Sequence, residues 1–291
     1  MSGIIWLASY PKSGNTWLRV LLTNFLRDAS EAADINKLLD DPIATARPCF
    51  DEWVGVEGAA LDANVVDRLR PEVYRCLARD ADETLFLKVH DAWARVDTGE
   101  PMFPADVTLG VVYIIRNPLD LAASCAHHWG TSVAVAVETL CCGSAAAGPP
   151  GGFSARGDSP AGYGLTGQLR QRLGSWGEHV QSWVDDSGGP LHVVRYEDLS
   201  ADPCGFFGGV VKFCGLDYDE DLVKKAVAFS SFGELQRQEA SAGFRERSSA
   251  APGGFFRRGE TGSWRDELPG DLAERLTAAH HETMRRFGYA G

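Results

Sequence analysis

A lysine and several small polar residues stand between an apolar run and a helical pattern near the start of the sequence. The run covers residues 4–8, and apolar residues recur at helical spacing from residue 17 to residue 22. The connecting loop therefore lies at a helix N-terminus, where unpaired N–H groups and the helix dipole favour an anion. We expect a phosphate or sulfate group to bind there. The candidate ligand residues are Lys12, Ser13, Gly14, Asn15 and Thr16.

The loop differs from the Walker A motif of ATPases. Lys12 precedes Gly14 instead of following a second glycine, and this order disfavours a general ATPase.

Polar side chains also stand at the ends of three later apolar runs. They are Lys88, His90 and Asp91 at the end of residues 84–90, Arg116 after residues 109–115, and Tyr196 at the end of residues 191–196. The carboxyl ends of parallel strands line one crevice, so we expect these side chains to meet Lys12 there. Cations and a histidine gathered in an acidic protein predict selection of a multiply charged anion.

A second anion site is predicted from residues further along the chain. Ser124 follows Arg116 by eight residues, about two turns into the next helix, so that one small anion could contact both side chains. Arg257 and Arg258 precede Gly259 in a loop rich in Gly, Ser and Arg, and they could clamp a phosphate. A solvated basic loop is the alternative interpretation of this segment.

Strands alternating with helices must position these residues. The pattern predicts an α/β fold with a P-loop-like parallel sheet of four to five strands, covered by helices on both faces. Strands are expected at residues 4–8, 84–90, 109–115 and 191–196. After the first helix, helices are expected at residues 61–81, 118–125, 165–184, 206–214, 219–229 and 268–287.

The length of 291 residues fits a single domain spanning 1–291. A Gly/Pro/Ala-rich stretch at about 141–164 is expected to be a flexible insertion, either a lid or a loop ordered by substrate. The loop at about 243–262 is expected to be mobile and to contact the nucleotide.

Composition excludes several classes of function. The net charge of −12 disfavours a nucleic-acid partner, because phosphate contacts need a basic face. The seven cysteines lack zinc-ligand spacing and are expected to be reduced, so we predict no metal site. The apolar run at residues 4–8 is too short for a signal peptide or a membrane span, and we expect a cytoplasmic protein without a membrane partner.

Five segments together resemble the sulfotransferases that use 3′-phosphoadenosine-5′-phosphosulfate (PAPS). The segments are YPKSGNTW, LKVH, IIRNPLD with a Ser eight residues after its Arg, RYEDL, and FFRRGETGSW. They occur in that family's order from Ile4 to Trp264, which is most of the chain.

The resemblance implies a role for each matching residue. The loop Lys12 to Thr16 would hold the 5′-phosphosulfate, with Lys12 beside the bridging oxygen. The residues implied at the 3′-phosphate are Arg116, Ser124, Arg257, Arg258 and Gly259. Those implied around adenine are Trp17, Tyr196, Ser231 and Phe232. Lys88 and His90 match the family's catalytic pair.

The implied reaction is in-line transfer of a sulfuryl group from PAPS to a hydroxyl of a small-molecule or natural-product acceptor. His90 would act as general base, while Lys12 and Lys88 would neutralise charge on the leaving phosphate, and no step needs a metal. The insertion at 141–164 hints at a bulky acceptor, and the family affiliation suggests a bacterial small-molecule enzyme.

Three departures from the family pattern leave questions open. Asn15 stands where many animal enzymes have a second Thr, a change that we expect to be tolerated. Pro269-Gly270 interrupts the dimerisation segment of those enzymes, so the oligomeric state is open. Asp91 could orient His90 or serve as the base in its place.

Two other functions are compatible with parts of the sequence. A P-loop-like kinase using ATP would leave the second anion site without a ligand. A non-catalytic protein that binds PAPS or adenosine bisphosphate would have no use for the pair of Lys88 and His90.

Overall fold

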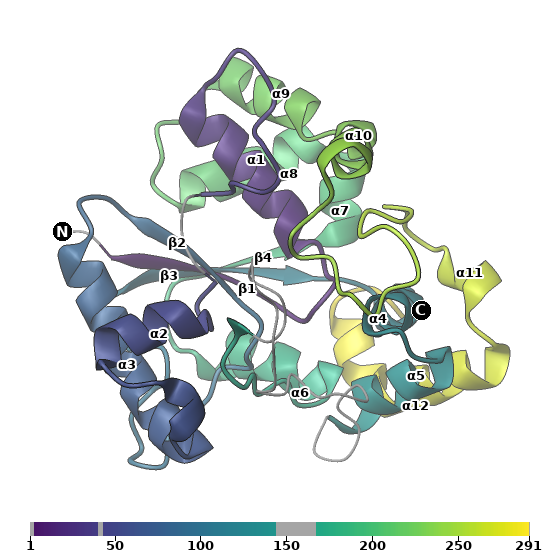
Figure 1. Cartoon of the computed structure of the whole chain (residues 1–291). Coiled ribbons are helices and arrows are strands. Elements are labelled where there is room, and N and C mark those ends of the chain that lie inside the picture. Colours follow the sequence, from purple (N-terminus) through teal and green to yellow (C-terminus); the bar gives the residue numbers. More distant parts are fainter. Residues whose placement is uncertain (1–2, 40–42, 144–166, 291) are drawn as a thin grey trace.

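Four parallel strands form the centre of the fold. The computed structural model describes residues 3–39, 43–143 and 167–290 (Figure 1). In these ranges the sheet has the order β2-β1-β3-β4. The strands are β1 (Ile4–Ser9), β2 (Leu85–Val89), β3 (Thr108–Ile115) and β4 (Leu191–Arg195). The predicted parallel sheet is therefore confirmed, with four strands.

Each face of the sheet packs against its own layer of helices. Side chains alternate along β1, so that Trp6 belongs to one buried cluster and Leu7 to the other. The Leu7 side is covered by α1 (Asn15–Arg27), α7 (Tyr196–Ala201), α8 (Pro203–Phe213) and α9 (Glu220–Phe229). The Trp6 side is covered by α3 (Ala63–Asp80), α4 (Pro118–Trp129), α5 (Val133–Cys142), α6 (Trp176–Gln181) and α12 (Gly270–Arg286).

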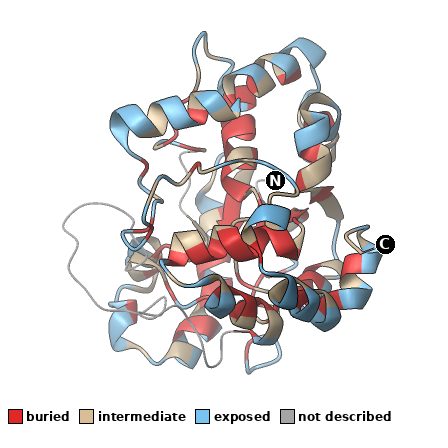
Figure 2. Ribbon diagram, turned by 90° about the vertical axis from the view of Figure 1, so that its right-hand side faces the viewer, coloured by how far each residue is buried: buried red, intermediate tan, exposed pale blue. Residues whose placement is uncertain are grey.

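Short helices complete the two layers. They are α2 (Arg47–Val54) and η1 (Gly58–Ala60) beside α3, the π-helical turn η3 (Ser182–Asp186) after α6, and α10 (Phe232–Ala242) and α11 (Trp264–Glu267) before and after the loop at residues 243–262, which is called the late loop below. Figure 2 shows buried residues along the inner faces of the helices and exposed residues on their outer faces. The helices on both faces that the sequence predicts are thus confirmed.

The strand order determines where a ligand can bind. β1 lies between β2 and β3, and the chain passes first to one neighbour and then to the other. Parallel sheets bind ligands at such a reversal, beyond the carboxyl ends of the strands. All four strands end at the same edge, which brings together the loop after β1 and the first residues after the other three strands.

The helix predicted at residues 165–184 is shorter than expected. Residues 168–175 are not helical, and α6 begins only at Trp176, where Ser175 and Glu178 form a capping box. Gly174 has a φ of 65°, which interrupts a helix at that point. Leu169 and Leu173 are nevertheless buried, as their apolar spacing indicates.

The remaining differences between the predicted and the observed structure concern individual helices and leave the two helical layers unchanged. The helices α5 and α10 have no counterpart among the sequence-based predictions, and Pro71 lies inside α3 without ending it. Residues 144–164 of the predicted insertion lie outside the described residues.

Two compositional expectations can be compared with the structure. All seven cysteines are free. Within residues 3–39, 43–143 and 167–290, none of the helices has the length and apolar character needed to cross a membrane.

Candidate active site

The loop after β1 has the backbone geometry of an anion-binding turn. Lys12 has a φ of 70° and Gly14 a φ of 111°, so two residues of the loop adopt left-handed conformations directly before α1. A Cβ at Gly14 would lie 2.6 Å from the ring of Tyr196, and only glycine fits there. The helix α1 therefore begins directly after this turn, beyond the carboxyl end of β1, as the sequence predicts.

Asn15 connects this loop to the sheet. Its Nδ2 donates to the carbonyl oxygen of Leu7 at 2.7 Å and to Oγ of Ser9 at 3.2 Å. The departure from the family pattern at this position therefore has a structural role, since the amide fixes the start of α1 against β1.

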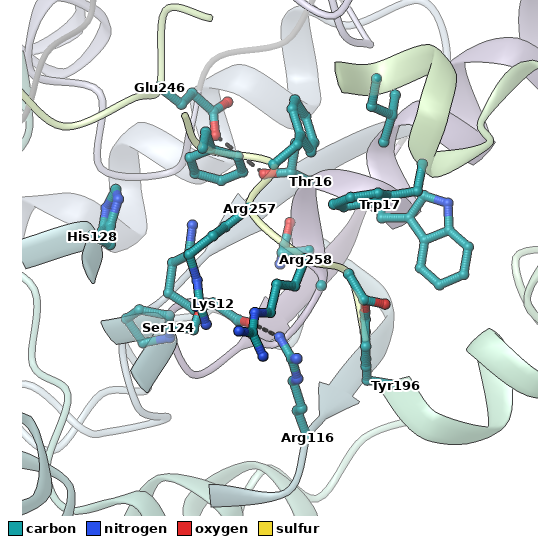
Figure 3. Close-up of a pocket in the computed structure, with 18 of the residues that line it drawn as sticks. Lys12, Thr16, Trp17, Arg116, Ser124, His128, Tyr196, Glu246, Arg257 and Arg258 are labelled. Carbon is teal, nitrogen blue, oxygen red and sulfur yellow. Dashed lines mark hydrogen bonds between the residues drawn. The ribbon is translucent and has the colours of Figure 1, made fainter. Parts of the chain in front are cut away.

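One cavity of about 410 Å³ collects the predicted site residues (Figure 3). Its lining includes every residue that the sequence indicated except Ser13 and Asp91, namely Lys12, Gly14, Asn15, Thr16, Trp17, Lys88, His90, Arg116, Ser124, Tyr196, Ser231, Phe232, Arg257, Arg258 and Gly259. Asp91 is buried against Arg70 instead, so the expectation that it faces the crevice is wrong. Ser13 is fully buried, and its Oγ has no hydrogen-bond partner among the described residues. The convergence of strand ends is thus observed in the structure.

Lys12 points into this cavity without a carboxylate partner at hydrogen-bond distance among the described residues. Its Nζ lies 3.3 Å from the centre of the Phe255 ring, a cation–π contact with the late loop. Burial, together with the neighbouring cations Lys88 and Arg116, lowers the pKa of Lys12 to about 7. A negative group entering the cavity would favour the ammonium form of this lysine.

His90 presents one ring nitrogen as an acceptor. Its Nδ1 lies 2.8 Å from the carbonyl oxygen of Ser9, and a carbonyl can only accept, so Nδ1 carries the proton and Nε2 the lone pair. Burial, and to a smaller degree Lys88, lowers the pKa of His90 well below its usual value. His90 is therefore neutral at pH 7, the form that a general base requires.

Asp91 does not contact the His90 ring. Both carboxylate oxygens accept bonds from Arg70, at 3.1 and 2.8 Å, and one also accepts from the N–H of Arg172 at 2.8 Å. Asp91 and Arg70 are fully buried, at 0% and 1% exposure. The question left open by the sequence is resolved by this geometry, because Asp91 fixes the backbone after β2 rather than the imidazole.

Glu246 of the late loop occupies the cavity beside three donors. Its carboxylate accepts from Arg19 Nη1 at 2.5 Å and from Lys88 Nζ at 2.8 Å. It also accepts from Thr16 Oγ1 at 3.5 Å (Figure 3). Although burial alone would raise it, the pKa of Glu246 is held well below its usual value by Arg19 and Lys88. An anionic side chain thus already contacts Lys88, one of the cations predicted to act on the phosphosulfate, and sequence reasoning missed both Glu246 and Arg19.

The second predicted anion site is only partly assembled. Arg116 donates to the carbonyl oxygens of Lys12 (3.3 Å) and Glu260 (2.9 Å) and stacks on Tyr196, with 4.3 Å between Cζ and the ring centre. Arg257 lines the same cavity, but its guanidinium forms an ion pair with Glu267.

Aromatic rings from three elements surround the far end of the cavity. Trp17 meets Tyr196 edge to face with ring centres 5.8 Å apart, and its Nε1 donates to the carbonyl oxygen of Ser230 at 2.9 Å. Phe232 packs under Gly259, where a Cβ would approach its ring to 2.5 Å. Such an apolar slot with few polar groups can hold a planar base.

His128 is a further cavity residue that the sequence reasoning missed. It lies on α4 four residues after Ser124, and its ring contacts Phe255 edge to face at 5.8 Å between centres. Burial, with Lys12 and Lys88 nearby, lowers its pKa to about 3. Residues four apart share one helix face, so the spacing from Ser124 was a signal that could have found it.

In the described part of the chain, no group of three or more His, Cys, Asp or Glu side chains is placed to hold a metal ion.

Comparisons with known proteins agree on one family. A family model described as the sulfotransferase domain matches residues 3–288. Canine sulfotransferase 1A1 (Canis lupus familiaris) is 24% identical over 290 residues, which cover 97% of this chain and 83% of the relative. Cytosolic sulfotransferase 17 of Arabidopsis thaliana is 24% identical over 306 residues, which cover 98% of this chain and 75% of the relative.

Solved structures share the fold. Mouse sulfotransferase SULT7A1 complexed with PAP superposes with a TM-score of 0.58 at 19% identity, covering 97% of this chain and 85% of that protein. Retinol dehydratase in a complex with retinol and PAP gives a TM-score of 0.59 at 16% identity, covering 98% and 82%. Because the family match spans nearly the whole sequence, the chain belongs to the family of PAPS-dependent sulfotransferases.

Proposed function

We propose that the protein transfers the sulfuryl group of PAPS to a hydroxyl group of a small-molecule acceptor, with His90 as general base. The observation that carries this proposal is the meeting, in one cavity, of Lys12, Lys88 and a neutral histidine whose Nε2 has no hydrogen-bond partner among the described residues. Fixed cations suit the charge that develops on a leaving phosphate, and the histidine suits the proton of the acceptor.

Three features of the cavity support a nucleotide with an anionic 5′ end. The carboxylate of Glu246 already rests on Lys88 and Thr16, which demonstrates that these donors accommodate an anion. Ser13 Oγ is buried without a partner in the described chain, and Gly14 leaves the loop close to the Tyr196 ring. We propose that the loop Lys12–Thr16 binds the phosphosulfate after Glu246 withdraws.

We assign the remaining contacts by the family pattern. Trp17, Tyr196, Ser231 and Phe232 would enclose adenine, and the 3′-phosphate would lie on Arg116, Ser124, Arg257, Arg258 and Gly259. For this, Arg257 would exchange its partner Glu267 for the phosphate. A bidentate guanidinium suits either group.

The chemical step needs positioning and charge neutralisation more than covalent intermediates. Nε2 of His90 would take the acceptor's proton as its oxygen attacks sulfur. The bond between sulfur and the bridging oxygen then breaks, and Lys12, Lys88 and the first N–H groups of α1 would stabilise the 5′-phosphate.

The class of acceptor is a finer proposal. A bulky natural-product hydroxyl is supported by the length of the insertion at about 141–164, and by the cytosolic small-molecule character that the family pattern implies. We further propose a cytoplasmic, single-domain enzyme, with its oligomeric state to be measured.

The test begins with ligand binding. A thermal-shift comparison of 3′,5′-adenosine bisphosphate, AMP and ATP should show selective stabilisation by the bisphosphate, because a ligand that binds only the folded state raises its stability by mass action. Equal shifts with AMP would refute the 3′-phosphate site, and a larger shift with ATP would favour a kinase.

Transfer of labelled sulfate from PAPS to a library of phenols and natural-product hydroxyls then tests catalysis. Labelled product is expected with the wild-type protein and not with His90→Ala. Bisphosphate binding without transfer to any acceptor would favour a non-catalytic binding protein.

A further inference from the structure

Three side chains of one helical segment hold the backbone that carries His90. His179 Nε2 lies 3.0 Å from the carbonyl oxygen of His90, and Trp183 Nε1 donates to the carbonyl oxygen of Asp91 at 2.9 Å. Ser182 Oγ accepts the N–H of Trp93 at 3.0 Å. Positions 179, 182 and 183 are spaced by three and four, so they lie on one face of the segment formed by α6 and η3.

The hydrogen bonds of His179 fix its tautomer. The carbonyl of His90 can only accept, so Nε2 of His179 must carry the proton. Nδ1 is then an acceptor, and it lies 2.8 Å from the hydroxyl of Tyr113, which donates. Two consecutive hydrogen bonds therefore link β3 to His90: the hydroxyl of Tyr113 on β3 donates to His179, and His179 donates to the carbonyl oxygen of His90.

His179 is fully buried and has a hydrogen-bond partner at each ring nitrogen. Its exposure is 0%, and the ring of Tyr10 meets it edge to face with centres 5.3 Å apart. Burial lowers the pKa of His179 to about 4, which keeps the ring neutral at pH 7. A buried polar ring is costly unless both nitrogens are bonded, and here both are.

Two hydrogen bonds hold His90, the proposed base, in place. The ring of His90 is fixed through Nδ1 on the carbonyl of Ser9, and its own carbonyl is fixed by His179. A displacement of about 1 Å at a reacting group can reduce turnover by about 10²-fold.

We infer that His179 is a positioning residue for the proposed base: by holding the carbonyl of His90, it keeps the imidazole on Ser9 and Nε2 directed into the cavity. This role rests on the proposed sulfuryl transfer, although the hydrogen-bond geometry itself can be tested without it.

Variants at His179 give a sharp test. His179→Leu should lower kcat about 10- to 100-fold while the Kd for 3′,5′-adenosine bisphosphate changes less than about twofold. In His179→Gln the amide nitrogen takes the place of Nε2, and in His179→Asn it takes that of Nδ1. The His179→Gln variant should therefore retain most of kcat, whereas the His179→Asn variant should lose it. Equal kcat values for these two variants would overturn the inference, even if the His179→Leu variant does not fold.

His280 offers a matched control on the same side of the sheet. It is also buried, its Nε2 bonds the carbonyl oxygen of Leu140 at 2.9 Å, and its ring packs on Trp176. His280→Leu should lower Tm comparably with His179→Leu but leave kcat unchanged. If both variants lower kcat in proportion to Tm, the role of His179 is only structural and the inference is wrong.

A double-mutant cycle separates positioning from stability. In a His90→Ala background, His179→Leu should change the residual kcat less than about twofold, because its effect passes through His90. A full additional 10-fold loss in that background would overturn the inference.

The tautomer of the His90 ring can also be measured without any substrate. Its ¹⁵N resonances should show a single Nδ1–H tautomer in the wild type and a mixture of tautomers in His179→Leu. An unchanged single tautomer in that variant would contradict the inference. Absence of sulfuryl transfer by the wild type would instead refute the proposed function, and the tautomer measurement would still decide the positioning role.

Discussion

Replacing Glu246 with glutamine should tighten the binding of 3′,5′-adenosine bisphosphate and, at the same time, destabilise the free protein. The carboxylate accepts bonds from Arg19, Lys88 and Thr16, and its side chain is only 8% exposed. In the proposed function the anionic end of the nucleotide binds Thr16 and Lys88 in place of the Glu246 carboxylate. The free energy that Glu246 gains from these donors therefore opposes nucleotide binding.

The magnitude follows from the contacts that change. A hydrogen bond to a charged group contributes about 1.5–3 kcal/mol, and a neutral one contributes roughly half as much. Glutamine keeps an accepting oxygen without charge, so the competition at Lys88 should weaken by about 1.4 kcal/mol, which corresponds to a Kd lower by about tenfold.

The free variant should lose stability because the cations remain. Arg19 is 2% exposed, and a buried charge that loses its ionic partner typically costs about 3–5 kcal/mol. We expect a loss near the lower end of this range, since the glutamine oxygen still accepts a bond from Arg19.

Calorimetric titration gives the Kd, and urea denaturation gives the free energy of unfolding. Glu234→Gln is the matched control, because it removes the same charge from an ion pair with Arg237 on α10. That control should leave the Kd unchanged. An unchanged or higher Kd for Glu246→Gln would refute the idea that this carboxylate competes with the nucleotide.

Three further predictions follow from the same site. His90→Ala should lower kcat about 10²- to 10⁴-fold in single-turnover transfer and keep the Kd for the bisphosphate, and unchanged turnover would remove His90 as base. Asp91→Asn should lower the free energy of unfolding by about 3 kcal/mol, because Arg70 loses the bidentate one of its two buried carboxylate partners and keeps only Asp67, and a wild-type value in urea denaturation would contradict this. The pKa of Lys12 is about 7 in the folded protein and higher in the unfolded chain. Between these two pKa values the folded state binds fewer protons than the unfolded chain, so the free energy of unfolding should rise with pH from about 7 to about 10. An anion raises this pKa, so bisphosphate binding at pH 8 should take up protons, and calorimetry in buffers of different ionisation enthalpy that detects no uptake would exclude Lys12 as a ligand.

The sheet and most of the cavity lining could be predicted because they depend on local patterns. Polar residues that close apolar runs, such as His90 and Arg116, must gather at one edge when the strands are parallel. The fold class and the presence of His90 in the cavity were therefore accessible from the order of residues along the chain, whereas its proposed role as base came from the family resemblance.

Contacts between distant segments could not be predicted in this way. Glu246 and Arg19 are 227 residues apart, and the late loop has no periodicity that indicates which side chain enters the cavity. His179 lies in a segment whose apolar spacing predicts only packing, so its bond to the carbonyl of His90 was invisible in the sequence. The same spacing predicted too long a helix, because Leu169 and Leu173 are buried without being helical.

The resident carboxylate of Glu246 also bears on how fast a nucleotide can enter. Lys88 and Arg19 are already neutralised in the free protein, and the net charge of the chain is −12. Lys12 and Arg116 have no carboxylate partner at hydrogen-bond distance in the described part of the chain, so the cavity keeps part of its positive potential, and the steering of a polyanion depends on these two cations. We expect an association rate that falls with ionic strength, but less steeply than for a cleft in which all cations are unpaired. In the proposed function, Glu246 must also leave Lys88 and Thr16 before the anionic end of the nucleotide can bind them.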